Sequence, residues 1–180
     1  MDAKAGELNQ ADPAEPASRV SVKLVAVVVV VGVVLDHLTK LWAVRTLAGR
    51  APIEILPTLE LDLHYNNGFS FGTGQGAGAL IGIAVIAMSG YLIHLLRKER
   101  SPRRGLILAI ILSGALGNLI DRVFRADDGP LSGDVIDFID VSWFAIFNVA
   151  DIFVVGGVGL FALFELFGPG RSGAGEGGQE

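Results

Sequence analysis

VIDFIDVSWFAIFNVAD, residues 135–151, is the stretch of this sequence that decides the fold. It places two carboxylates, Asp137 and Asp151, and the amide of Asn148 in very apolar surroundings, and it leads directly into a hydrophobic segment. A charge at membrane depth is costly unless it is paired or hydrated, so an acid in such a segment is first of all a hypothesis about function. The remainder of the chain should therefore provide the structure that makes these acids tolerable.

The composition indicates a membrane protein. Of the 180 residues, 51% are hydrophobic, and the mean hydropathy of +0.54 is too high for an ordinary soluble domain. The net charge of -5 argues against a nucleic-acid partner, because phosphate binding requires a basic face. The absence of cysteine excludes a disulfide, a thiolate nucleophile and a cysteine-based metal site. His37, His64 and His94 are scattered without metal-ligand spacing, so neither a metal nor another cofactor is predicted.

Four apolar segments are long enough to cross a bilayer as helices. They cover residues 23–44, 77–96, 105–124 and 147–167. The first segment is too long for a signal peptide and lacks a cleavage pattern, so we expect it to be retained. Residues 1–19 and 169–180 are predicted to be flexible tails, which leaves residues 20–168 as one membrane domain.

Residues 50–72 have a different pattern, in which apolar and polar residues alternate with a period of two. Ile53, Ile55 and Leu61 alternate with Glu54 and other polar residues, which is typical of half-buried strands. Pro57 interrupts the run. Because open sheet edges are not tolerated within lipid, we expect a small sheet at the membrane surface. A glycine-rich turn, residues 72–78, then leads to the second span.

The basic loop at residues 97–104 is placed in the cytoplasm by the positive-inside rule, and with four spans both termini lie there too. The polar residues near the other helix ends then converge at the outer leaflet. They come from the first span, the approach to the second, the third span and the fourth: Asp36, Thr39, Lys40, Asn66, Asn118, Asp121, Arg122, Asn148 and Asp151.

Two kinds of polar group are expected in this cluster. Asp36 and Lys40 are four residues apart, and Asn118, Asp121 and Arg122 lie within one turn, so each set is either neutralised internally or functional. Asp137 and Asp151 have no local cation. Two acids in a shared environment hold one proton between them, which suits general acid and base chemistry at neutral pH. Asn148 would share a helical face with Asp151 and support the pair.

Five blocks of residues resemble one known family in the same order along the chain. These blocks are 36-DHLTK-40, 66-NNGFSF-71, 114-GALGNLIDR-122, 135-VIDF-138 and 147-FNVAD-151. They are similar to lipoprotein signal peptidase, the type II signal peptidase of bacteria, over residues 23–167. The resemblance implies a four-helix aspartyl endopeptidase of the inner membrane that cuts prolipoproteins just before a diacylglyceryl-modified cysteine. It also implies inhibition by globomycin, a cyclic peptide that occupies the site.

The resemblance also implies roles for individual residues. The catalytic pair falls on Asp137 and Asp151, and Asp121 remains a rival for Asp137 whose neighbour Arg122 favours a paired, structural role. The supporting or substrate-binding positions fall on Asp36, Lys40, Asn66, Gly68, Asn118, Asp121, Arg122 and Asn148. The predicted fold is an all-α membrane protein of four transmembrane helices, with a β-cradle at residues 50–72 and a short surface helix at residues 136–146.

Two other classes of protein have to be weighed against the peptidase. A small proton-coupled transporter also carries intramembrane acids and lysines, but these should be spread through the membrane depth rather than gathered on one side. A lipid-binding scaffold would need only the apolar helices and could lose Asp151.

For the peptidase, the expected partners are a diacylglyceryl prolipoprotein, membrane lipid and a globomycin-type inhibitor. The chain is expected to act as a monomer, with its site near the outer leaflet.

Overall fold

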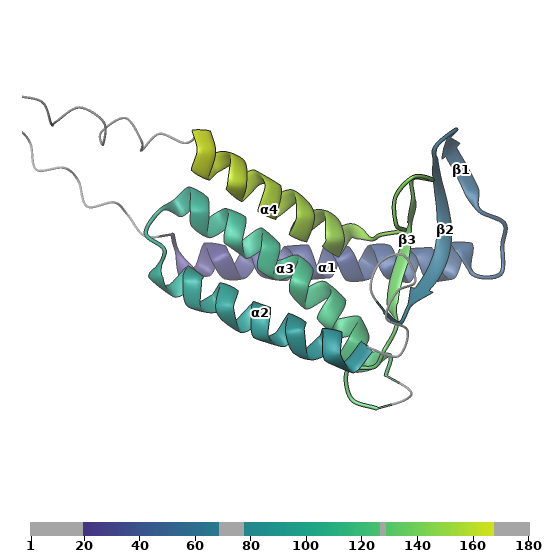
Figure 1. The fold of residues 1–180 in the computed structure, drawn as a ribbon, viewed down its shortest axis with the longest axis horizontal. Helices are drawn as coiled ribbons and strands as arrows, with labels where there is room; N and C mark the ends of the chain where they lie inside the picture. Colours follow the sequence, from purple (N-terminus) through teal and green to yellow (C-terminus); the bar gives the residue numbers. More distant parts are fainter. Residues whose placement is uncertain (1–19, 69–77, 127–128, 168–180) are drawn as a thin grey trace, which may run out of the picture.

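The computed structural model describes residues 20–68, 78–126 and 129–167, and within them four helices lie side by side with a small sheet at one end of the bundle (Figure 1). The helices are α1 (Val22–Leu47), α2 (Gly78–Lys98), α3 (Pro102–Phe124) and α4 (Val149–Phe167). Each is long and apolar enough to cross a membrane. The four predicted spans are therefore confirmed. The predicted tails and most of the glycine-rich turn lie outside the described residues.

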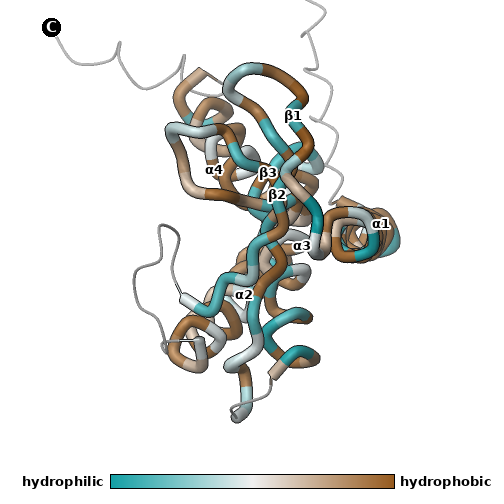
Figure 2. Tube along the Cα trace, turned by 90° about the vertical axis from the view of Figure 1, so that its right-hand side faces the viewer, coloured by the Kyte–Doolittle hydropathy of each residue, from teal (hydrophilic) through white to brown (hydrophobic). Residues whose placement is uncertain are grey.

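Helix α3 is the centre of the bundle. It packs against each of the other three helices. Of its 18-residue apolar stretch, 61% is buried, compared with 11% of the corresponding stretches of α1 and α4. Figure 2, viewed from the sheet end, shows α1, α2 and α4 arranged around α3, with α2 and α4 well separated. The outer helices therefore present broad apolar surfaces, as a protein surrounded by lipid requires.

Glycines allow the helices to approach α3 closely. A Cβ at Gly117 would lie 2.6 Å from Asp36 Oδ2 of α1, and a Cβ at Gly114 would overlap the carbonyl oxygen of Ala150 in α4. A side chain at either position would force the helices apart. The same contacts bring the polar residues of α1 and α4 directly against α3.

The sheet has three antiparallel strands in the order β1 (Ile53–Leu56), β2 (Leu59–Asn66) and β3 (Val135–Asp140). Strands β1 and β2 confirm the sheet predicted within residues 50–72, and Pro57 lies in the turn between them. Strand β3 joins β2 in a register that pairs His64 with Asp137 and Asn66 with Val135. The segment that carries Asp137 is thus attached to the strand that carries Asn66.

The predicted surface helix at residues 136–146 is wrong, because the chain forms β3 there and then continues without a helix to α4. Ile136 and Phe138 pack on Ala43 and Leu47 near the end of α1, and the alternation of a strand directs both side chains to that one face. After the strand the chain turns back, and Phe147 exchanges main-chain hydrogen bonds with Ile139 at 3.0 and 2.9 Å. Pairing with β2 and burial on α1 therefore outweigh the amphipathic pattern of this segment.

Candidate functional site

Buried polar side chains gather where the helices meet the sheet. Six of them are almost inaccessible to solvent: Asp36, Lys40, Asp121, Arg122, Asp137 and Asn148. Burying such groups is unfavourable unless hydrogen bonds or ion pairs compensate the lost hydration. The contacts of each group therefore determine what it can do.

The start of α4 positions Asp151. Asn148 Oδ1 accepts a hydrogen bond from the Asp151 amide at 3.0 Å, and Asp151 Oδ2 accepts one from the Asn148 amide at 3.1 Å. This reciprocal arrangement is a capping box, which satisfies main-chain donors that the first turn of a helix leaves unpaired. A third such donor, the amide of Ala150, bonds to Asp36 Oδ1 of α1 at 2.9 Å. Asp151 is thus held by the same contacts that begin the helix.

Asp137 receives two amide donors from different elements. Asn66 Nδ2 of β2 donates to Asp137 Oδ2 at 2.9 Å, and Asn148 Nδ2 donates to Asp137 Oδ1 at 2.6 Å. Asn148 therefore contacts both acids, since its oxygen caps the Asp151 amide while its nitrogen bonds to Asp137. The carboxylates of Asp137 and Asp151 are thus linked through one residue, Asn148, whose side chain bonds to Asp137 and whose main-chain amide bonds to Asp151.

Asn118 of α3 completes the support of Asp151. Its Nδ2 donates to Asp151 Oδ1 at 2.8 Å, and its Oδ1 accepts from Lys40 Nζ at 2.8 Å and from Asn148 Nδ2 at 3.1 Å. Because two donors face the amide oxygen, the orientation of this side chain is determined by its surroundings. The nitrogen of Asn118 must point at Asp151.

Lys40 pairs with acids from two helices. Its Nζ lies 2.7 Å from Asp36 Oδ2 and 2.9 Å from Asp121 Oδ2. Asp121 Oδ1 also lies 3.0 Å from the Nε of Arg125. Asp121 is consequently neutralised by two cations, whereas neither Asp137 nor Asp151 forms a direct ion pair with any residue that the structure describes. This difference separates Asp121 from Asp137, which the sequence left as rivals.

Arg122 does not pair with its neighbour Asp121, so of the two alternatives left open for this turn, neutralisation within it is wrong. Its guanidinium donates to the carbonyl oxygens of Gly68 at 3.0 Å and Gly133 at 3.4 Å. The amide of Gly68 in turn donates to Asn66 Oδ1 at 3.1 Å. Arg122 therefore ties the end of β2 to the segment before β3 and supports Asn66 indirectly.

Burial perturbs the acidity of Asp137, which lies on β3 outside the membrane-spanning segments. Desolvation raises the pKa of this carboxyl to about 6, and the negative charge of Asp151 acts in the same direction. Hydrogen bonds from Asn66 and Asn148 and the charge of Lys40 oppose this rise in pKa. A carboxyl with such a pKa exchanges a proton readily near neutral pH.

All ten predicted site residues belong to one connected network of hydrogen bonds and ion pairs. Arg125 belongs to it too and was not predicted, although its i,i+4 spacing from Asp121 was a usable signal. The pairing of Lys40 with Asp121 crosses from α1 to α3, so no local pattern could have indicated it. Four membrane-spanning helices, together with an acid of α4 and an acid of β3 that form no ion pair with any described residue, indicate a polytopic membrane protein of the aspartic hydrolase class.

Comparison with known proteins agrees with this class. A family model described as signal peptidase (SPase) II matches residues 28–167, and the chain belongs to the signal peptidase II family, whose members are aspartic proteases. The chain is 40% identical to the lipoprotein signal peptidase of Mycolicibacterium smegmatis over 157 residues, which cover 87% of this chain and 66% of that protein. It is 37% identical to that of Mycobacterium tuberculosis H37Rv over 158 residues, covering 87% of this chain and 78% of the relative.

Two solved structures share the fold. One, described as a bacterial membrane enzyme structure at 2.3 Å resolution, superposes with a TM-score of 0.71 at 26% identity and covers 90% of this chain and 98% of that chain. Another, described in the same words at 1.9 Å resolution, gives a TM-score of 0.70 at 27% identity and covers 86% of this chain and 99% of that chain. The family and the fold support the peptidase and do not support the transporter.

Proposed function

We propose that Asp137 and Asp151 are the catalytic pair with which this lipoprotein signal peptidase hydrolyses the peptide bond before the diacylglyceryl-modified cysteine of a prolipoprotein. The observation that carries the assignment is the link through Asn148, which contacts both acids while Asp121 is neutralised by Lys40 and Arg125. No other two carboxyls among the described residues are both free of cations and joined in this way.

The chemistry follows from one proton shared by two acids. The ionised carboxylate accepts a proton from a water molecule as the water oxygen attacks the scissile carbonyl carbon. The other carboxyl, still protonated, then donates its proton to the leaving amine nitrogen while the carbon–nitrogen bond breaks. Asn118, Asn148 and Asn66 keep both carboxyls in place during these transfers. The pair ends with one proton again, so no further acid or base is required.

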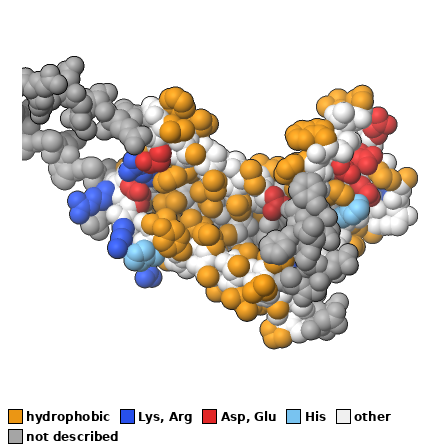
Figure 3. All heavy atoms as spheres, in the orientation of Figure 1, with side chains coloured by type: hydrophobic (Ala, Val, Ile, Leu, Met, Phe, Trp, Pro, Cys, Tyr) orange, Lys and Arg blue, Asp and Glu red, His pale blue; other side chains and the backbone are white. Residues whose placement is uncertain are grey.

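We further propose that the site faces the outer leaflet. Basic side chains of the connection between α2 and α3 gather at the end of the bundle away from the sheet (Figure 3), which the positive-inside rule assigns to the cytoplasm together with both termini. The acyl chains of a substrate would then remain in the bilayer while its scissile bond reaches the acids beneath the sheet. A globomycin-type peptide would inhibit by occupying this place, and the chain would act as a monomer.

The test of the pair is the replacement of each acid by asparagine in the purified, detergent-solubilised protein. Asp137→Asn and Asp151→Asn should each lower kcat by at least about 1,000-fold on a diacylglyceryl prolipoprotein, because the remaining acid cannot serve as both acid and base. The matched control is Asp140→Asn, on the same strand as Asp137 and outside the network. Unchanged thermal unfolding would show that the variants fold, and near-normal turnover by either one would refute the assignment.

Globomycin provides an independent test of where the substrate binds. It should inhibit the wild-type protein competitively with the prolipoprotein, and cross-linking of a labelled analogue should label residues at the sheet end of the bundle. Labelling at the opposite end would contradict the proposed sidedness. Mass measurement of the protein in detergent would test the monomer.

A further inference from the structure

A histidine lies on the same face of the sheet as Asp137. His64 of β2 is the direct cross-strand partner of Asp137 in β3, and directly opposed residues of an antiparallel pair share a face with their Cβ atoms about 4.5–5.5 Å apart. Asn66, two residues further along β2, is on this face too and donates to Asp137 at 2.9 Å. His64 and Asn66 therefore both lie on the face of the sheet that carries Asp137.

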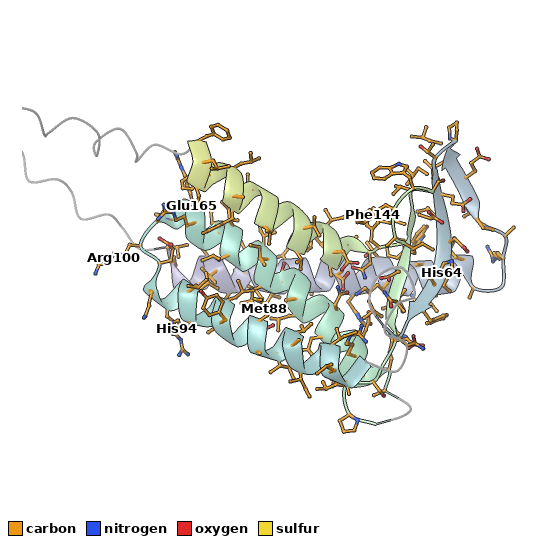
Figure 4. The ribbon with its side chains drawn as sticks, in the orientation of Figure 1. His64, Met88, His94, Arg100, Phe144 and Glu165 are labelled. Carbon is orange, nitrogen blue, oxygen red and sulfur yellow. The ribbon has the colours of Figure 1, made fainter. Side chains whose placement is uncertain are left out.

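The imidazole is held in place but remains accessible. His64 Nε2 lies 2.8 Å from Asp62 Oδ2, and the two side chains are 50% and 30% exposed. No hydrogen bond to Nδ1 is formed by any residue that the structure describes. Figure 4 places His64 on β2, at the sheet end of the bundle and far from His94. The Asp62–His64 pair thus presents one ring nitrogen at the surface of the cradle, outside the buried network.

The substrate segment that follows the lipidated cysteine passes close to Asp62 and His64. The apolar signal segment favours the bilayer and the helices, so the residues after the cysteine must leave across the sheet. Because His64 is the direct cross-strand partner of Asp137, their Cβ atoms lie about 4.5–5.5 Å apart. A peptide residue bound at His64 is therefore within about one or two residues of the scissile bond.

We propose that Asp62 and His64 form a binding subsite for the main chain of the residues immediately after the lipidated cysteine; this rests on the proposed function. Asp62 orients the ring through Nε2. Nδ1 accepts a peptide N–H when the ring is neutral and donates to a peptide carbonyl when it is charged. The subsite therefore binds the extended backbone of the substrate rather than a particular side chain. His64 is a binding residue and takes no part in proton transfer.

The test compares two synthetic lipopeptide substrates with the full-length protein. The long one continues for several residues after the diacylglyceryl cysteine, and the short one ends in an amide at the cysteine. His64→Ala should raise KM for the long substrate about fivefold to tenfold, as expected for one lost hydrogen bond, with kcat little changed. The rise should be confined to the long substrate. Asp62→Asn, which leaves the ring less well oriented, should give a smaller effect of the same kind.

Tyr65→Ala is the matched control, because Tyr65 is the exposed neighbour of His64 whose side chain points to the other face of β2. It should leave KM for both substrates unchanged. An equal loss on the long and short substrates, or a lower kcat with a shifted pH profile, would overturn the subsite, since His64 would then act on the acids. Asp137→Asn, run in parallel, separates this outcome from failure of the proposed function: turnover by that variant refutes the acid pair itself.

Discussion

Asn148 and Asp151 bond to each other twice at the start of α4, each through its side chain and the main-chain amide of the other, at 3.0 and 3.1 Å. This capping box places Asp151, one acid of the proposed catalytic pair, at a helix N-terminus, where the helix dipole also favours its negative charge. The same Asn148 side chain bonds to Asp137 at 2.6 Å. The geometry of the proposed catalytic pair is therefore coupled to the geometry of a helix end.

The double use of Asn148 predicts separate effects on folding and catalysis. Asn148→Ser keeps an oxygen that can cap α4 but removes the nitrogen that bonds to Asp137, so stability should change little while kcat falls about 10-fold to 100-fold. Asn148→Ala should show the same loss of kcat and also lose about 1 kcal/mol of stability, because the cap is gone. Turnover and thermal unfolding of both variants provide the check. A serine variant with full activity would contradict the link between the acids.

Lys40 is predicted to be essential for stability. Lys40→Met leaves the carboxylates of Asp36 and Asp121 buried without their shared cation, and breaking a buried pair in this way costs about 3–5 kcal/mol. The measurement is unfolding in detergent. Lys98→Met, at an exposed position, is the control and should change stability by less than about 0.5 kcal/mol. Adding Asp36→Asn and Asp121→Asn to Lys40→Met should recover part of the loss, and a lack of recovery would count against a charge effect.

The contact of α3 with α4 predicts that a small substitution outside the polar network lowers activity. A methyl group at Gly114 would meet the carbonyl oxygen of Ala150, which is main chain and cannot rotate away. Gly114→Ala should therefore shift the first turn of α4, displace Asp151, and cost about 1–3 kcal/mol of stability. Gly156→Ala is the control, because no atom lies within 4 Å of its added Cβ. Normal kcat in Gly114→Ala would show that α4 is not held where the structure has it.

The pKa of Asp137 predicts a pH effect with a definite sign. One limb of the pH profile of kcat/KM, which reports the free enzyme, should lie near the pKa of about 6. The hydrogen bond from Asn66 stabilises the ionised carboxylate and so lowers this pKa. Asn66→Ala should therefore move the limb to higher pH, by about one unit for a contribution of about 1.4 kcal/mol. A shift to lower pH would contradict the assignment of the limb to Asp137.

Much of the fold could be predicted because the responsible signals are local. Four apolar runs, the alternation around Ile53 and the break at Pro57 each depend on neighbouring residues alone, and all appear in the structure. The prediction of a helix in place of β3 is wrong because this strand depends on pairing with β2, which is about 70 residues away in the sequence. Only the sheet and the end of α1 make a strand the better state for that segment.

By itself, the sequence determined the membrane class, the four spans and the set of polar residues that meet at one end of the bundle, since hydropathy and charge are properties of the chain. The tertiary structure alone decided which of those acids are paired with a cation and which are joined by hydrogen bonds. Lys40 reaches both Asp36 and Asp121 across helices, while Asn148 reaches both Asp137 and Asp151 across a strand and a helix. Which acid is neutralised depends on which cation lies within about 3 Å, and only the packing of α1, α3, α4 and β3 brings those groups together.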